Sequence, residues 1–125
     1  MNELDPYERK MLEGWEEVFK RGQLTFWVLL ALRDGPKHMA EIRGWMTDIS
    51  EGALTVEERS LYRALQRFHD SELVTSSAVA GSKGPDRKLY TLSPIGERVL
   101  SAFIERDVRL FLKPEVARLL ESPKQ

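Results

Sequence analysis

The sequence predicts a mainly α fold with a small β component (α+β), and two features of the chain predict it. Apolar residues recur at helical spacing through most of the chain, both before residue 70 and after residue 93. Between these parts, two short runs rich in β-branched or alternating residues flank the segment GSKGPD, whose glycines and proline suit a hairpin tip. A chain of 125 residues has the length of one domain, 1–125.

The composition excludes several kinds of protein. Hydrophobic residues make up 42% and charged residues 31%, as in a typical soluble globular domain. The absence of cysteine excludes disulfides and cysteine-based zinc sites. The longest apolar run, residues 26–32, is far shorter than the roughly 20 residues that span a bilayer. The N-terminus is polar and acidic, unlike a signal peptide, so we expect a cytoplasmic protein without a membrane partner.

Helices are predicted over the first half of the chain. Asp5-Pro6 predicts the start of an N-terminal helix over residues 5–21, which Gly22 ends. The next stretch, LTFWVLLAL, is apolar on every side and predicts the most buried helix, ended by DGPK at 34–37. A short amphipathic helix follows, and then a loop at SEGAL; the helix is predicted by the spacing of Met39, Ile42, Met46 and Ile49.

The helix before the predicted hairpin has one apolar and one basic face. Thr55 and Glu58 have the spacing of a capping box, which predicts a helix from about residue 56 to residue 70 or 71. Its apolar face consists of Leu61, Leu65 and Phe68. The opposite face has no acidic residue before Asp70 and carries Arg59, Arg63, Gln66 and Arg67.

The hairpin and a final helix complete the predicted fold. LVTSSAVA and RKLYTL are the expected strands. Ser93-Pro94 is a strong helix start, with serine as the N-cap and proline at the first helical position. Pro114 interrupts the helix that follows, whose apolar residues are Val99, Leu100, Phe103, Ile104, Val108 and Phe111.

Three short helices followed by a hairpin have the order of a winged helix-turn-helix, which we assign to residues 22–92. Residues 5–21 and 93–121 are expected to be added N-terminal and C-terminal dimerisation helices. In this fold the helix before the hairpin enters the major groove of DNA. The net charge is only −1, but residues 59–88 hold six bases and three acids. An arginine fork can bond a guanine edge or a phosphate, and wing cations would neutralise phosphates.

Three segments resemble the PadR family of transcriptional regulators. SLYRALQRFHDSELV is similar to the family's Ser-Leu-Tyr-x-Ala-Leu signature. RKLYTLSPIGERVL resembles its Arg-Lys-Tyr-Tyr-x-Leu-Thr-x-x-Gly stretch, and LLALRDGPKHMAEI resembles its Leu-Leu-x-x-Gly-Pro-x-His-Gly-Tyr-Glu-Ile stretch. The three lie in the family's order from about Leu24 to Leu100. Three positions depart from the family pattern: Met39-Ala40 replaces Gly-Tyr, Glu72 replaces a helix-ending glycine, and Leu89 replaces the first wing tyrosine.

The resemblance implies site residues on the predicted recognition helix and wing. It implies that Ser60, Tyr62 and Arg63 contact DNA, that Lys88 contacts the backbone, and that Tyr90 packs the wing. Together with the charge pattern, this gives the expected double-stranded DNA contacts as Arg59, Ser60, Tyr62, Arg63, Arg67, Lys83, Arg87 and Lys88. For Tyr62, packing beside the apolar face is an equal alternative.

The resemblance also implies a homodimeric repressor whose C-terminal helix pairs with the partner subunit. The expected dimer contacts are Trp15, Leu100, Phe103, Ile104, Val108 and Phe111. Several family members respond to small planar aromatic or cationic compounds near the dimer interface, and here Trp15, Phe19 and Phe103 would line such a site. The alternative is that these aromatic residues serve only core and dimer contacts.

Catalysis is not predicted, and no cofactor or metal is expected. His38 and His69 lie far apart without metal-ligand spacing, and GSKG lacks the length of a phosphate loop. Two other interpretations stay open: a different winged-helix family, such as the MarR type, or a winged helix that docks a protein instead of DNA. The near-zero net charge and the acidic residues 1–20 allow the second. Steep salt dependence of duplex binding would separate DNA binding from protein docking.

Overall fold

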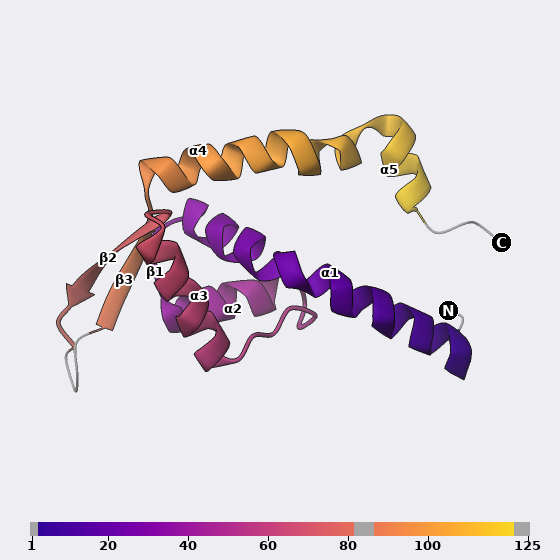
Figure 1. The fold of residues 1–125 in the computed structure, drawn as a ribbon, viewed down its shortest axis with the longest axis horizontal. Helices are drawn as coiled ribbons and strands as arrows, with labels where there is room; N and C mark the ends of the chain where they lie inside the picture. Colours follow the sequence, from indigo (N-terminus) through magenta and orange to yellow (C-terminus); the bar gives the residue numbers. More distant parts are fainter. Residues whose placement is uncertain (1–2, 82–86, 122–125) are drawn as a thin grey trace.

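The computed structural model describes residues 3–81 and 87–121, in which helices pack together beside a small sheet that lies at one end of the molecule (Figure 1). Its elements in chain order are α1 (Pro6–Arg33), β1 (Lys37–His38), α2 (Met39–Ile49), α3 (Glu58–Asp70), β2 (Val74–Val79), β3 (Arg87–Leu92) and α4 (Pro94–Phe103). After α4 the chain continues through a π-helical turn, Ile104–Val108, a 3-10 turn, Arg109–Leu112, and the short helix α5 (Pro114–Leu120).

The first helix is continuous, so the prediction that Gly22 ends it is wrong. Asp5 and Glu8 form a capping box at its start, with hydrogen bonds of 2.9 and 2.8 Å. A glycine inside a helix costs only about 1 kcal/mol, and good helix formers on both sides of Gly22 outweigh this cost. The helix ends instead at the Gly35-Pro36 turn. Three helices therefore precede the hairpin, where the sequence predicted four.

The core lies where the C-terminal half of α1 meets α2, α3, α4 and the sheet. The most deeply buried side chains there come from every one of these elements: Val28, Ile42, Leu61, Leu65, Val74 and Leu100. The predicted apolar face of α3 is confirmed, because Phe68 is buried together with Leu61 and Leu65. In α2, Ile42 and Met46 are buried, whereas Ile49 is exposed.

The sheet is antiparallel with the order β1-β3-β2, and the predicted hairpin is confirmed. Val74 pairs with Leu92 at its base and Val79 pairs with Arg87 at its outer end. The strand β1, which the sequence analysis did not predict, pairs its two residues with β3. A two-residue strand has no period to detect, but it attaches the start of α2 to the wing.

The prediction of a Thr55 cap on α3 is also wrong. The helix begins at Glu58, and its N-cap residue is Glu57, whose side chain makes no capping hydrogen bond. The preceding loop is held by other contacts: Leu54 N donates to Ser50 Oγ (2.8 Å), and Arg43 Nε donates to the Val56 carbonyl (3.1 Å). These bonds hold the loop in a non-helical conformation, so α3 begins two residues later than predicted.

A polar corner joins the hairpin to α4, as Ser93-Pro94 predicted. The Ser93 hydroxyl accepts a bond from Gly96 N (2.9 Å) and donates to the Glu72 carbonyl (2.6 Å). A Cβ atom at Gly96 would collide with the Leu73 carbonyl oxygen, so only glycine permits this close approach. The turn after α3 and the start of α4 are thereby locked together.

Glu72 keeps the left-handed conformation that a glycine would adopt at this position, with φ of 66°. A side chain with a Cβ atom is strained there, so we expect Glu72→Gly to raise the free energy of unfolding by about 1 kcal/mol. The urea concentration at the unfolding midpoint measures this change. An unchanged or lower midpoint would show that the conformation at residue 72 carries no strain.

The C-terminal region departs from the single long helix that was predicted. Regular α-helix ends at Phe103, and most side chains from residue 105 to 112 are exposed, so little packing holds a uniform helix there. Lys113 is extended because a residue before proline avoids the helical region. Arg33 holds α4 against α1 through an ion pair with Glu97 (2.7 Å) and a hydrogen bond to the Ser101 hydroxyl (2.6 Å).

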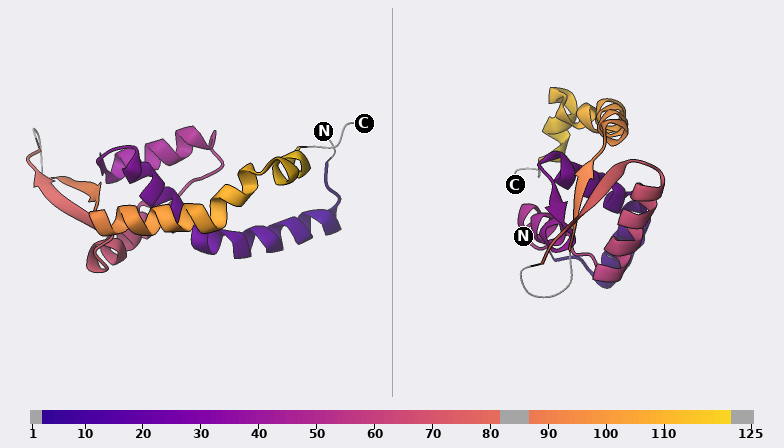
Figure 2. Two further views of the ribbon diagram at one scale, coloured as in Figure 1. Left: turned by 90° about the horizontal axis from the view of Figure 1, so that it is seen from above. Right: turned by 90° about the vertical axis from the view of Figure 1, so that its left-hand side faces the viewer.

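Both terminal regions project from the core toward the same side. Figures 1 and 2 show that the N-terminal half of α1 and the chain from α4 to α5 extend away from the sheet, with the wing at the opposite end of the molecule. Large apolar side chains are exposed along both projections, including Met11, Trp15, Val18, Phe19, Phe111, Leu112, Leu119 and Leu120.

Candidate nucleic-acid interface

The exposed face of α3 is basic. Arg59, Arg63 and Arg67 are all exposed, while the buried Leu61 and Leu65 attach the helix to the core. None of the three arginines forms an ion pair with an acid in the described part of the chain. Three guanidinium groups on a rigid helix, without acidic partners, form a surface suited to an anionic ligand.

The wing adds two further cations beside α3. Arg87 and Lys88 begin β3 and are exposed. Lys83, the third predicted wing cation, lies outside the described residues, as does the rest of the segment 82–86. The structure therefore describes five of the six predicted basic contacts, all exposed, with three on α3 and two on β3.

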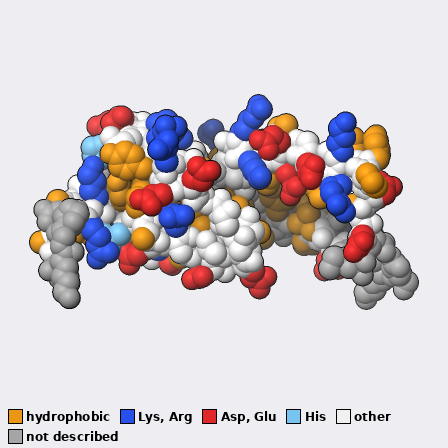
Figure 3. Space-filling view, turned by 90° about the horizontal axis from the view of Figure 1, so that it is seen from below, with side chains coloured by type: hydrophobic (Ala, Val, Ile, Leu, Met, Phe, Trp, Pro, Cys, Tyr) orange, Lys and Arg blue, Asp and Glu red, His pale blue; other side chains and the backbone are white. Residues whose placement is uncertain are grey.

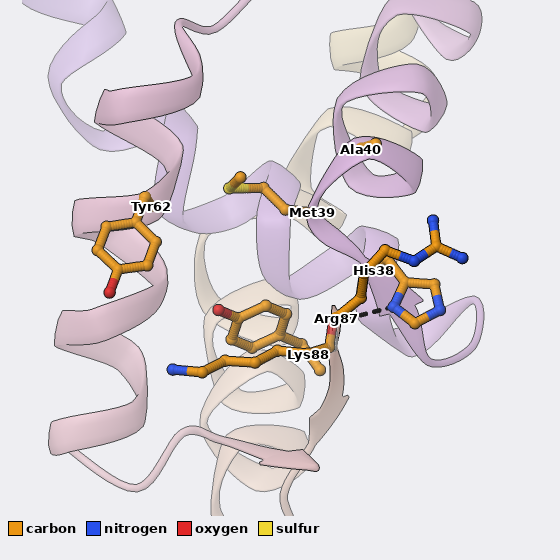
Figure 4. A pocket seen from close by; sticks show the side chains of 7 residues that line it. His38, Met39, Ala40, Tyr62, Arg87 and Lys88 are labelled. Atoms are coloured by element: carbon orange, nitrogen blue, oxygen red, sulfur yellow. Dashed lines mark hydrogen bonds between the residues drawn. The ribbon is translucent and has the colours of Figure 1, made fainter. Parts of the chain in front are cut away.

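A cavity of about 280 Å³ separates α3 from the wing (Figure 4). In Figure 4, Lys88 extends from β3 toward α3, while Arg87 lies beside His38 at the start of α2. The walls carry more apolar than polar atoms. Four elements, β1, α2, α3 and β3, supply the lining residues, which are His38, Met39, Ala40, Tyr62, Arg87, Lys88 and Tyr90.

Two tyrosines and a histidine set the chemistry of this cavity. Tyr62 is 46% exposed, whereas Tyr90 is only 3% exposed and belongs to the core, as the packing role implied. Burial raises the pKa of the Tyr90 phenol, and the nearby Tyr62 adds to this effect. His38 Nδ1 lies 3.0 Å from the Lys88 carbonyl oxygen, which can only accept, so this nitrogen carries a proton. The bond fixes the wing strand to the start of α2.

Acidic groups border the interface without neutralising it. Glu41 is exposed at the start of α2, where its carboxylate accepts a hydrogen bond from His38 N (2.8 Å). Glu58 lies 3.9 Å from Arg43, an exposed and therefore weak ion pair. Figure 3 shows blue, red and orange side chains intermixed on the face that ends at the wing. The basic character is thus local to α3 and β3.

Not every predicted contact lies on the basic face. Ser60 lines a different cavity, between α3, the preceding loop and α1, together with Trp27 and Glu57. Tyr62 and Ser60 therefore occupy opposite edges of α3. Met39, Ala40 and His38 were not among the predicted site residues, although the departure at Met39-Ala40 from the family pattern was the available signal.

The predicted effector residues do not form one site within a single chain. Trp15 and Phe19 share a shallow cleft with Leu12 and Glu16 on the projecting half of α1. Phe103 lies elsewhere, with its ring centroid 5.4 Å from that of Phe26.

The expected dimer contacts differ in how accessible they are. Leu100 is buried in the chain's own core, and Ile104 and Val108 are half-buried. The exposed contacts are Trp15, Phe103 and Phe111.

Within residues 3–81 and 87–121, no group of three or more His, Asp or Glu side chains is arranged to hold a metal ion. None of the helices in these ranges is long and apolar enough to cross a membrane.

Comparisons with known structures support the predicted fold. A PadR family transcriptional regulator from Eggerthella lenta DSM 2243 superposes with a TM-score of 0.69 at 25% identity, covering 92% of this chain and 96% of that chain. A PadR-like transcription factor from Bacteroides fragilis gives 0.64 at 25% identity, covering 85% and 98%. Bacillus subtilis PadR, solved in complex with operator DNA, gives 0.63 at 18% identity, covering 81% and 60%. No curated protein sequence matches this chain.

The family comparison agrees with the structural one. A model described as the transcriptional regulator PadR-like family matches residues 28–102, which span the end of α1, the helix-turn-helix, the wing and α4. These residues are more than half of the chain and include every segment in which the sequence resembled PadR proteins. The mainly helical fold with its small antiparallel sheet is the PadR-like winged helix. The chain therefore belongs to the PadR-like family of transcriptional regulators.

Proposed function

We propose that this protein binds duplex DNA sequence-specifically, with α3 in the major groove and the β2–β3 wing against the backbone. The observation that carries this proposal is the row of Arg59, Arg63 and Arg67 on the exposed face of α3, the helix that shares a cavity with the wing cations Arg87 and Lys88. An arginine can form two hydrogen bonds with a guanine edge, which gives base preference as well as charge attraction. The B. subtilis PadR complex with operator DNA supports this assignment, since the two folds are similar.

The protein acts as a homodimer in this proposal. Trp15 is 73% exposed and Phe111 is 47% exposed, and both lie on the parts that project from the core. A soluble chain rarely leaves so much apolar surface uncovered, and a second copy would cover it. A two-fold dimer also presents two α3 helices to two half-sites about one DNA turn apart.

The regulatory outcome is repression in the cytoplasm, as the family resemblance implied. Operator occupancy by such a dimer would block transcription directly. A small aromatic or cationic effector is proposed to bind near Trp15 and Phe19, where Glu16 supplies a carboxylate for a cation and the rings supply π faces. Phe103 of the same chain lies outside this cleft. It would complete the effector site only if it came from the partner subunit or if the chain rearranged.

Selection of bound fragments from random-sequence duplexes tests the proposal. We expect enriched fragments to share two inverted half-sites with centres 10–10.5 base pairs apart, or a multiple of that spacing. Enrichment without any shared sequence would contradict specific recognition. Failure to retain any duplex would favour the protein-docking alternative.

The wing is expected to contribute affinity without base preference. The double variant Arg87→Ala/Lys88→Ala should weaken selected and scrambled duplexes alike, because phosphate contacts carry no sequence information. The slope of log affinity against log salt should become less steep by about one for each phosphate contact removed. The control variant Lys10→Ala/Arg98→Ala removes two cations from α1 and α4 and should leave the slope unchanged. An altered base preference with an unchanged slope would contradict the assignment.

A further inference from the structure

The cavity that Ser60 lines lies at the edge of α3 away from Tyr62. The loop between α2 and α3 passes beside the middle of α1 (Figure 1), and the cavity between them has a volume of about 390 Å³. Its walls come from α1, α2, this loop and the start of α3. The volume is in the range of small-molecule sites in proteins. None of the lining residues belongs to the cleft of Trp15 and Phe19 or to the cavity beside the wing.

The most buried part of this cavity is apolar. Met46 is buried, and Leu24, Trp27 and Leu54 are half-buried against the core. The Trp27 indole donates a hydrogen bond from Nε1 to Gln23 Oε1 (2.8 Å), which fixes the orientation of the ring. A rigid apolar wall of this kind suits a large apolar group of a ligand, which gains free energy when it leaves water.

The exposed residues of the cavity include one cation and one anion. Lys20 stands on α1, and Glu57 is the residue before α3, so the two charges belong to different walls. Among the residues that the structure describes, neither side chain forms an ion pair or a hydrogen bond. The hydroxyl groups of Thr55 and Ser60 add two neutral hydrogen-bonding groups. This lining is complementary to a ligand that carries a negative charge, a positive charge and an apolar group.

We propose that this cavity is a second effector site, which binds the zwitterion of a free amino acid with a large apolar side chain. The Lys20 ammonium binds the carboxylate of the ligand, the Glu57 carboxylate binds its ammonium group, and its side chain lies against Trp27. A ligand with a single charge would use only one of the two protein charges. The effector role rests on the proposed function, because Glu57 directly precedes the helix that carries the arginine row. The bound amino acid joins α1 to this end of α3 and so restricts the position of the helix.

Calorimetry with L-leucine and two analogues tests the site. The analogue 3-methylbutylamine lacks the carboxylate of L-leucine, and 4-methylpentanoate lacks its ammonium group. We expect the protein to bind L-leucine about fivefold or more tightly than either analogue, since each analogue loses one charge-assisted contact at an exposed position. Absence of saturable L-leucine binding at millimolar concentration, or equal affinity for L-leucine and both analogues, would overturn the proposal.

Two variants that each remove one charge assign the contacts. Lys20→Gln should lower the affinity for L-leucine about fivefold and leave that for 3-methylbutylamine unchanged. Glu57→Gln should lower the affinity for L-leucine equally and leave that for 4-methylpentanoate unchanged. The matched controls Arg21→Gln and Glu58→Gln change neighbouring exposed charges that do not line the cavity, and should bind L-leucine like the wild type. Affinities for L-leucine that are equal in the variants and in their controls would overturn the assignment.

Duplex binding with and without saturating L-leucine tests the effector role. We expect the amino acid to change the affinity for the selected duplex by about fivefold or more, and the duplex to change the affinity for L-leucine by the same factor. An unchanged duplex affinity, with L-leucine binding intact, would overturn the effector role. Absence of duplex binding by the wild type, with or without L-leucine, would instead overturn the proposed function itself.

Discussion

Arg63→Ala is expected to weaken binding to the selected duplex by about 1–3 kcal/mol and to relax the preference at one base position. Arg63 lies near the centre of the exposed face of α3, opposite the buried Leu61 and Leu65. A guanidinium at this point of a helix in the major groove reaches base edges, whereas side chains at the edges of the face reach the backbone. Binding measurements with duplexes that vary one base pair at a time give both quantities.

The control for this variant is Arg98→Ala. Arg98 is exposed on α4 and outside the basic face, so its loss changes the net charge equally but should leave the base preference unchanged. If Arg63→Ala kept both wild-type affinity and wild-type base preference, α3 would not be the recognition helix.

Trp15→Glu is expected to convert the proposed dimer to monomers and to lower operator affinity about 100-fold or more. The indole is 73% exposed within its own chain, so the substitution leaves the core unchanged and acts on the proposed contact between chains. A carboxylate buried in an apolar interface is strongly destabilising. Loss of the partner also removes the second recognition helix, and with it the gain that two linked half-sites provide. Light scattering at micromolar concentration measures the oligomeric state.

Lys10→Gln is a matched control for this variant. It changes the net charge by the same amount but lies on the opposite face of α1, since five residues separate it from Trp15 on a helix of 3.6 residues per turn. We expect Lys10→Gln to remain dimeric. A wild-type protein that is monomeric at this concentration, or a Trp15→Glu variant that is still dimeric, would contradict the assignment of α1 to the interface.

Much of the fold was predictable because it depends on local patterns. The spacing of Leu61, Leu65 and Phe68 predicted the buried face of α3, and Ser93-Pro94 predicted the start of α4. The predictions that failed are those in which the surrounding structure outweighs a local signal for the start or end of a helix. Gly22 can end a helix, but nothing beyond it favours the left-handed turn that such an ending needs. Thr55 can cap a helix, but contacts of the preceding loop keep it outside α3.

The candidate site was predictable in its charges but not in its shape. The four-residue spacing of the arginines along α3 already predicted that they lie opposite the apolar face of this helix. The predicted hairpin likewise placed Arg87 and Lys88 on the wing. The cavity between them depends on four elements meeting in space, and one of these, the two-residue strand β1 that brings α2 to the wing, has no sequence signature. Ser60 and Tyr62 lie at opposite edges of α3, where they face different cavities. The sequence does not show which elements lie beside each edge.

The salt dependence of duplex binding tests the central claim most directly. For the selected duplex and a scrambled one of equal length, log affinity should fall linearly with log salt concentration. The expected slope is about −4 or steeper, since two wing cations from each protomer of a dimer release about four counterions. At physiological salt the selected duplex should bind at least about 1,000-fold more tightly than the scrambled duplex. Weak binding that is insensitive to salt and equal for both duplexes would contradict DNA recognition by α3 and the wing.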